Sequence, residues 1–193
     1  MKLFTIALLG IAPVFASATM ITFDEFGTQP ALFDNASPVN DTYLPQGVRF
    51  RGPGGSTEIG GMMLNDSTFT VKAHSGNNFL AMLSSFNPEQ LTFTTPQNAV
   101  SIYAASVDTH AGTFVMAAFD ANGNQIDSDT LTLARGVWGQ LSVTAPSISK
   151  VTLTETSGVF TFVYDDLNFS PVPEPASFAV LAVGALALMR RRK

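Results

Sequence analysis

The 193 residues carry a formal net charge of −5 and include no cysteine. The absence of cysteine excludes disulfides, a cysteine nucleophile and zinc bound by cysteine. Residues 19–170 hold five basic and fourteen acidic residues, a net charge of −9, because half of the basic residues lie in the two ends of the chain. A domain of that charge repels phosphate backbones, so no nucleic acid is expected as a partner.

Residues 1–18 have the three-part organisation of a signal peptide. A lysine precedes the apolar run 3–14, and Ala16 and Ala18 supply the small residues that a signal peptidase reads. The alternative is a buried N-terminal helix, but cleavage before Thr19 would leave a strand-like start for the mature chain. We therefore expect an N-terminal signal helix, removed by signal peptidase, and export of the remainder.

Residues 19–170 are expected to form one domain of strands, because about 150 residues suffice for one core. Runs rich in Val, Ile, Thr, Phe and Tyr alternate with turn residues. The candidate strands are 20–24, 47–51, 69–73, 79–83, 90–94, 100–105, 113–120, 125–133, 139–143, 150–154 and 159–169. Several alternate cleanly, as in 91–94, which predicts one buried and one solvated face. We predict an all-β fold, an antiparallel two-sheet β-sandwich of jelly-roll type.

A turn rich in Asp, Asn and Gly separates two of these strands at residues 120–124. It superficially resembles a calcium-binding loop, but an EF-hand requires Gly at the sixth position and Glu at the twelfth. Those positions are Gln125 and Leu131. The sequence therefore favours an Asn-Gly hairpin turn.

Acidic pairs lie at both ends of the predicted domain. Asp24 and Glu25 follow the first strand, and Asp165 and Asp166 lie in the last one. The first and last strands of a jelly roll often lie close together, and calcium prefers oxygen ligands. Adjacent residues on a strand point to opposite faces, so at most one acid of each pair is expected at a shared ion. A structural calcium is the one cofactor that the sequence suggests; the alternative is solvated edge charges.

The sequence contains no motif with a catalytic mechanism. His74 and His110 are the only histidines, and neither a Gly-x-Ser-x-Gly elbow nor a His-Glu-x-x-His metal motif is present. We therefore expect a protein that is not an enzyme. Trp138, the only tryptophan, either anchors the core or stacks on a sugar ring if it is exposed. Tyr43 and Tyr103 are left undecided between the same two roles.

Residues 171–193 form a third part of the chain. Three prolines within 171–175 make a stiff extended spacer, and residues 176–189 follow without a charge. As a helix these would rise about 21 Å, short of the roughly 30 Å hydrocarbon core. The chain ends in four basic residues that the positive-inside rule keeps in the cytoplasm: Arg190, Arg191, Arg192 and Lys193. We predict a marginal hydrophobic helix with a basic stop, held transiently in the inner membrane.

The order Val172, Pro173, Glu174, Pro175, then a short apolar helix and an Arg-rich end, resembles the PEP-CTERM sorting signal of Gram-negative bacteria. The resemblance implies that exosortase, a membrane transpeptidase-like enzyme, recognises the tail and cuts near the motif. It also implies a host that makes exopolysaccharide. By this resemblance, Pro173, Glu174 and Pro175 are substrate residues and not catalytic ones. The alternative is a plain tail anchor.

The start of the predicted domain, Ile21-Thr22-Phe23-Asp24, and its end at 165–170 resemble exported domains that carry such tails. Those domains are similar to galactose-binding-like jelly rolls and carbohydrate-binding modules. The resemblance implies an exported cell-surface or extracellular-matrix protein, associated with exopolysaccharide or biofilm, that binds carbohydrate or matrix without catalysis. A structural surface protein without a discrete ligand is the alternative, and a secreted hydrolase is a distant third.

Overall fold

A computed structural model describes residues 17–108 and 110–172. Five 3-10 turns lie in its first half: η1 (Phe33–Asn35), η2 (Leu44–Gln46), η3 (Pro53–Gly55), η4 (Asp66–Thr68) and η5 (Ser84–Phe86). The nine strands are β1 (Thr19–Ile21), β2 (Val48–Arg51), β3 (Met62–Asn65), β4 (Asn78–Leu83), β5 (Glu89–Ser106), β6 (Gly112–Phe119), β7 (Gln125–Leu133), β8 (Gly139–Glu155) and β9 (Thr161–Pro171). The helices expected within 1–18 and 176–189 fall almost wholly outside the described residues. Within the described ranges, no helix is long and apolar enough to cross a membrane.

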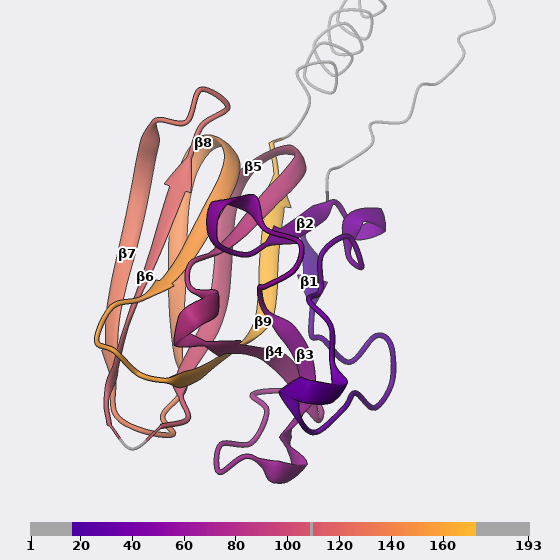
Figure 1. Cartoon of the computed structure of the whole chain (residues 1–193). Helices are drawn as coiled ribbons and strands as arrows, with labels where there is room; N and C mark the ends of the chain where they lie inside the picture. The colour runs from indigo at the N-terminus through magenta and orange to yellow at the C-terminus, as the bar shows by residue number, and fades with distance from the viewer. Residues whose placement is uncertain (1–16, 109, 173–193) are drawn as a thin grey trace, which may run out of the picture. The chain divides into compact units, whose positions relative to one another are not determined.

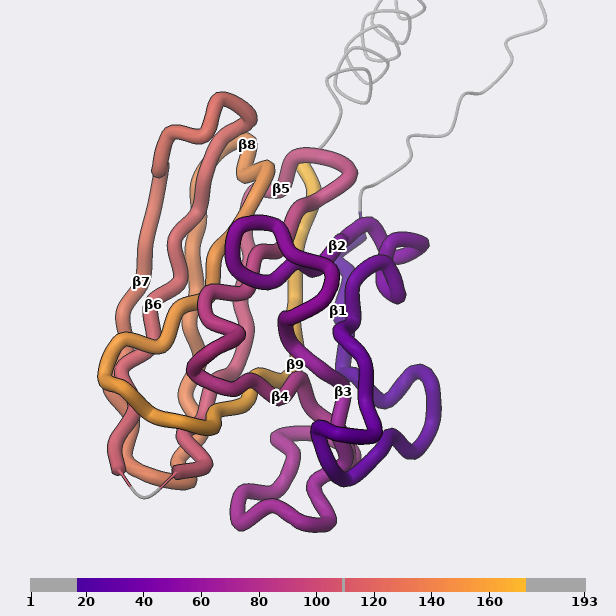
Figure 2. The backbone as a smooth tube through the Cα atoms, in the orientation of Figure 1, coloured from indigo at the N-terminus to yellow at the C-terminus, as the bar shows by residue number. Residues whose placement is uncertain are grey.

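All strand pairs are antiparallel, in the order β3-β4-β9-β5-β8-β6-β7, with β1 added to β9 and β2 added to β5. The long strands β5 and β8 change neighbours along their length. The first part of β5 pairs with β2, and the rest pairs with β9. The last part of β8 pairs with β6. By these pairings one half of the sheet contains β2, β6 and β7, and the other contains β1, β3, β4 and β9. In Figures 1 and 2, β6 and β7 lie on the left of the molecule and β1 and β3 on the right.

Side chains from both halves meet in one core. Phe114 of β6 lies edge-on to Phe162 and Tyr164 of β9, with ring centroids 6.1 and 6.0 Å apart. The alternation predicted for β5 is confirmed, because Leu91 and Phe93 are buried while the threonines beside them are exposed. The predicted all-β, antiparallel β-sandwich is thus confirmed.

A second, smaller cluster covers the outer face of β4 and β9. Alternation puts Phe79 and Val163 into this cluster, whereas their strand neighbours point into the core. The expected strand at residues 69–73 is wrong: this segment makes no ladder. Its apolar side chains alternate because Phe69 and Val71 pack onto the outer sheet face. Burial produced the pattern without strand pairing.

The first and last strands are neighbours, as expected for a jelly roll. Thr19 pairs with Phe169, and Ile21 pairs with Leu167. The Asn-Gly hairpin is also confirmed, because Gln125 at the start of β7 pairs back onto Phe119 of β6. Residues Ala18–Val172 form one compact unit.

Candidate functional site

A β-bulge in β9 places two adjacent carboxylates against one loop. Ser101 pairs with Asn168 and Tyr103 pairs with Asp165, so β9 advances three residues while β5 advances two. Asp166 is the extra residue and has φ +49°, in the left-handed region. The expectation that Asp165 and Asp166 point to opposite faces is therefore wrong. Both carboxylates contact the segment that holds His74.

Asp165 is fully buried and binds backbone groups. Its Oδ2 accepts hydrogen bonds from the backbone N–H of His74 at 2.8 Å and of Ser75 at 3.2 Å, and its Oδ1 accepts from Asp166 N. Burial raises the pKa of Asp165 to about 7, although these hydrogen bonds favour the charged form. The carboxylate therefore fixes the backbone of the loop before β4.

Asp166 orients a histidine ring. Its Oδ2 lies 2.5 Å from His74 Nδ1, and its Oδ1 accepts a hydrogen bond from Ser75 Oγ. The His74 ring stacks on Tyr103, with centroids 3.7 Å apart, and meets Trp138 edge-on at 5.7 Å. Trp138 Nε1 donates to the Lys72 carbonyl at 2.9 Å. We call the three rings of His74, Tyr103 and Trp138 the ring platform.

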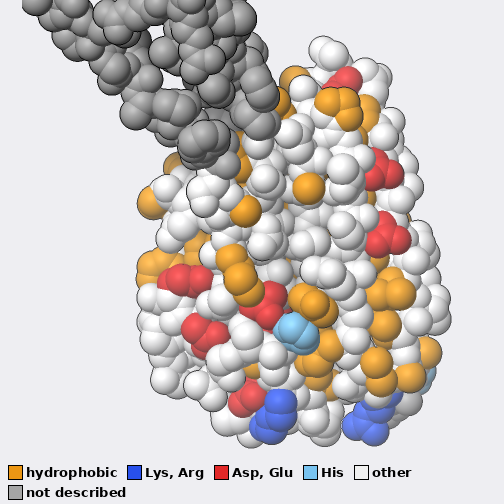
Figure 3. Space-filling model, turned by 180° about the vertical axis from the view of Figure 1, so that it is seen from behind, with side chains coloured by type: hydrophobic (Ala, Val, Ile, Leu, Met, Phe, Trp, Pro, Cys, Tyr) orange, Lys and Arg blue, Asp and Glu red, His pale blue; other side chains and the backbone are white. Residues whose placement is uncertain are grey.

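The ring platform is partly open to solvent. The His74 side chain is 31% exposed, and Tyr103 and Trp138 are half-buried. Trp138 also packs against the outer cluster, so part of its side chain is buried and part is exposed; stacking on a sugar ring stays a prediction. In Figure 3, which shows the back of the molecule, a histidine side chain lies beside acidic and hydrophobic side chains.

Side chains with uncharged hydrogen-bonding groups lie beside the ring platform on the same face of the sheet. Tyr103 pairs with Gln140 of β8, and Ser101 pairs with Ser142 and, on the other side, with Asn168. Gln140 is exposed and its Nε2 lies 3.3 Å from Ser101 Oγ. The outer face therefore offers aromatic rings next to a row of amide and hydroxyl groups.

Asp24 holds the other end of the same loop. Its Oδ1 accepts from Asn77 N and from both nitrogens of Asn78, at 2.8 to 3.1 Å. Gly76 lies between the two attachment points at φ +57°, and a Cβ there would lie 1.8 Å from Asp24 Oδ2. Carboxylates that follow β1 and lie in β9 thus hold one loop, 74–78.

Glu25 faces a different group. Its Oε1 accepts from Thr22 N at 2.7 Å, and its Oε2 accepts from the Tyr43 hydroxyl at 2.9 Å. Burial, followed by the nearby Glu25 charge, raises the pKa of Tyr43, which belongs to the core. Across residues 17–108 and 110–172, no three histidine, aspartate or glutamate side chains gather so that they could hold a metal ion. Calcium at Asp24, Glu25, Asp165 or Asp166 stays a prediction.

The processing residues lie at or beyond the ends of the described chain. Thr19 is the first residue of β1, and Val172 directly follows β9. Ala16, the residues Pro173, Glu174 and Pro175, and the terminal basic cluster lie outside the described residues. Sequence reasoning did not single out Ser75 or Gln140, and it assigned no site role to His74. The acids in the last strand, together with Trp138 and Tyr103, are the residues of this site that the sequence singles out.

Comparisons with known proteins agree on the fold and on the tail. Residues 171–193 match the PEP-CTERM protein-sorting motif. No curated protein matches the chain in sequence. A DUF4465 family protein from Bacteroides caccae is 13% identical, with a TM-score of 0.56 over 82% of this chain and 100% of that one. The K2 cleaved adhesin domain of Lys-gingipain is 15% identical, with a TM-score of 0.52 over 79% of this chain and 99% of that one.

The xylan-binding domain CBM22-1 of Paenibacillus barcinonensis Xyn10C is also similar, at 17% identity and a TM-score of 0.49, over 84% of this chain and 99% of that one. At these identities the likenesses concern the fold alone. The tail match is independent of them and covers the last residues of the chain. The chain therefore joins an all-β domain to a PEP-CTERM sorting motif, which marks an exported protein sorted to the cell envelope or surface.

Proposed function

We propose that this chain is an exosortase-sorted surface or extracellular-matrix protein of a Gram-negative bacterium, whose β-sandwich binds carbohydrate without catalysis. Its processing partners are signal peptidase and exosortase, with the inner membrane as a transient anchor. The tail supports the sorting part, since it matches the PEP-CTERM motif. Exopolysaccharide is the proposed ligand at the final location.

The ring platform is the observation that carries the binding part. A sugar ring has an apolar C–H face that packs on an aromatic ring, while its hydroxyls need hydrogen-bonding partners. Trp138 and His74 supply ring surface, and Gln140 with Ser101 supplies amide and hydroxyl groups beside it. Asp166 and the stacked Tyr103 hold His74 in place before any ligand arrives. Such preorganisation reduces the entropy lost on binding.

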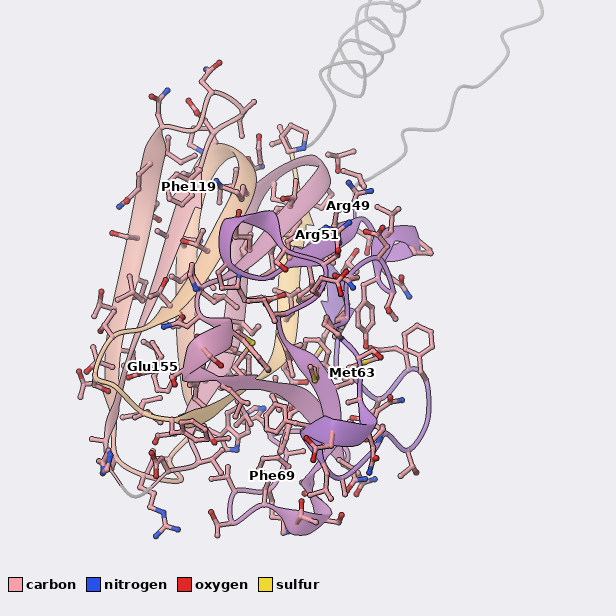
Figure 4. The ribbon with its side chains drawn as sticks, viewed as in Figure 1. Arg49, Arg51, Met63, Phe69, Phe119 and Glu155 are labelled. Atoms are coloured by element: carbon pink, nitrogen blue, oxygen red, sulfur yellow. The ribbon has the colours of Figure 1, made fainter. Side chains whose placement is uncertain are left out.

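The charge of the domain favours a neutral glycan over an anionic one. Residues 19–170 carry fourteen acidic and five basic residues. Arg49 and Arg51 lie side by side on β2 and both contact Asp41, at 2.7 and 2.9 Å (Figure 4). The Lys72 carbonyl accepts the hydrogen bond from Trp138, which places this basic residue beside the ring platform. Its Nζ lies 3.7 Å from Asp66 Oδ1. An acidic polysaccharide would meet net repulsion at this surface.

Glycan-array screening of residues 18–172, followed by calorimetry with the glycans that bind, tests the proposal. Trp138→Ala and His74→Ala should each weaken binding by about tenfold, equivalent to about 1.4 kcal/mol. Phe160→Ala is the matched control, because this exposed aromatic side chain is not part of the ring platform. Thermal melting of every variant separates lost binding from lost folding.

The variant Gln140→Ala tests the polar part of the site, because it removes an exposed amide and leaves the three rings unchanged. It should weaken binding of the same glycans with an unchanged melting temperature. If the folded domain binds no glycan, the binding role fails and a structural surface protein remains. If Trp138→Ala and Phe160→Ala bind a glycan equally well, the ring platform is not the binding site.

A further inference from the structure

The sorting motif and the folded domain share residues. The motif match begins at Pro171, yet Pro171 is the last residue of β9 and pairs with Gln97 of β5. The backbone N–H of Val172 donates to the Pro96 carbonyl at 3.1 Å. The first two residues of the motif are therefore held by the ladder of the domain.

The end of β9 is held by its ladder with β5. On the other side the strand has β4 along Thr161–Tyr164 and β1 along Leu167–Phe169, whereas Ser170 and Pro171 pair with β5 alone. Phe169 pairs with Val100 and Thr19, is almost fully buried, and packs on Phe93 with ring centroids 5.1 Å apart. Opening this end breaks backbone hydrogen bonds and, if it reaches Phe169, exposes apolar surface.

The sequence leaves almost no spacer after the strand. Three residues, Pro173 to Pro175, separate Val172 from the uncharged run that starts at Ala176. Fully extended, three residues span at most about 11 Å. Binding of an extended peptide by an enzyme commonly uses its main-chain N–H and C=O groups. Some of these groups in β9 are already bonded to β5, and the last bond of this pairing among the described residues runs from the Val172 N–H to the Pro96 carbonyl.

We propose that the end of β9 is a gate for processing: exosortase cuts this chain only after residues 170–172 have left the ladder with β5. Exosortase then binds the freed segment together with the following prolines. The rate of cutting is set by the fraction of molecules in which the strand end is open. This inference rests on the sorting part of the proposed function.

A spacer tests the gate. Six residues, Gly-Ser repeated three times, are inserted after Ser170 in the full-length chain, so that the motif 171–193 stays intact. In a host with exosortase, pulse-chase labelling should show this precursor cut about tenfold faster than wild type. The same insertion between Asn122 and Gly123, in the exposed hairpin turn, is the control and should be cut at the wild-type rate.

A disulfide tests the opposite change. Ala99 and Ser170 are partners across β5 and β9, and the natural chain has no cysteine that would interfere. The double variant Ala99→Cys, Ser170→Cys, with its bond confirmed by thiol labelling, should stay uncut until a reductant is added. The two single-cysteine variants should be cut at the wild-type rate.

The outcomes separate the gate from the sorting itself. If the spacer precursor is cut no faster than wild type, or if the disulfide-bonded precursor is cut as fast, the gate does not exist. If neither wild type nor the spacer precursor is cut in a host that processes another PEP-CTERM protein, the sorting part of the proposed function fails.

Discussion

Residues 19–88 and 89–171 build the same sandwich by different means. The second region consists of five strands of eight to eighteen residues joined by short connections. The first has four strands of three to six residues and five 3-10 turns. Carboxylate side chains hold loop 74–78 of the first region. The second region is held mainly by backbone hydrogen bonds between its long strands. The ring platform lies where a loop of the first region meets the sheet of the second.

The largest expected effect is in the long-strand region, at Glu155. This nearly buried carboxylate accepts hydrogen bonds from the N–H groups of Thr113, Ser157, Gly158 and Val159. Glu155→Ala would leave these donors without their partner, so it should lower the free energy of unfolding by about 4 kcal/mol. Urea unfolding measures the change. Glu155→Gln keeps one acceptor oxygen and should lose about half as much; equal losses would show that the acceptor is unimportant.

The second prediction concerns Glu89, where the two regions meet. Its Oε2 accepts from Gly61 N at 2.8 Å, and burial raises its pKa to about 7. The unfolded chain releases this proton near pH 4.5, so the native state binds more protons between pH 4.5 and 7. Stability should therefore fall as the pH rises through this window, by about 3 kcal/mol from this group, and level off above it.

Glu89→Gln removes the titration and keeps an acceptor for Gly61. The difference in free energy of unfolding between Glu89→Gln and wild type should change by the same amount between pH 4.5 and 8, in favour of the variant at high pH. Urea titrations at both pH values measure it. A constant difference would contradict the shifted pKa.

The third prediction tests whether the loop of the short-strand region is fixed. Gly76→Ala places a methyl group against Asp24, which must then give up its bonds to Asn77 and Asn78. Gly54→Ala is the matched control, because Gly54 also has a positive φ but has open space around its Cα. We expect Gly76→Ala to be about 2 kcal/mol less stable than Gly54→Ala in thermal unfolding. Equal losses would mean that backbone strain alone acts at both positions.

The smallest expected effect is that of calcium. If Asp24 and Asp165 share an ion, a chelator should lower the melting temperature of the Ala18–Val172 unit. If the free calcium concentration before chelation is ten times the dissociation constant, removing calcium lowers the free energy of unfolding by about 1.4 kcal/mol. Melting curves in calcium and in chelator, with Asp165→Asn as a control that should show no difference, measure it. If the wild-type melting curves in calcium and in chelator superimpose, the domain binds no structural calcium.

The contrast also explains what the sequence could reveal. Leu91 and Phe93 alternate with threonines because β5 is buried on one face, and that pattern is visible in the sequence. The segment with Phe69 and Val71 shows the same alternation without a ladder, so the prediction of a strand there failed. The bulge at Asp166 depends on the register with β5, which no local pattern encodes. His74 was overlooked because a carboxylate 92 positions away orients it.

The pairing of Thr19 with Phe169 has a consequence for translocation. A chain threaded through a channel with its N-terminus first delivers β1 at once, but the partner of β1 arrives last. Until β9 emerges, β1 and β4 lack a neighbour, and β5 lacks one along its second half. In a chain threaded this way the sandwich would close only after β9 has emerged, and a peptidase acting near Thr19 would meet a strand that is still unpaired.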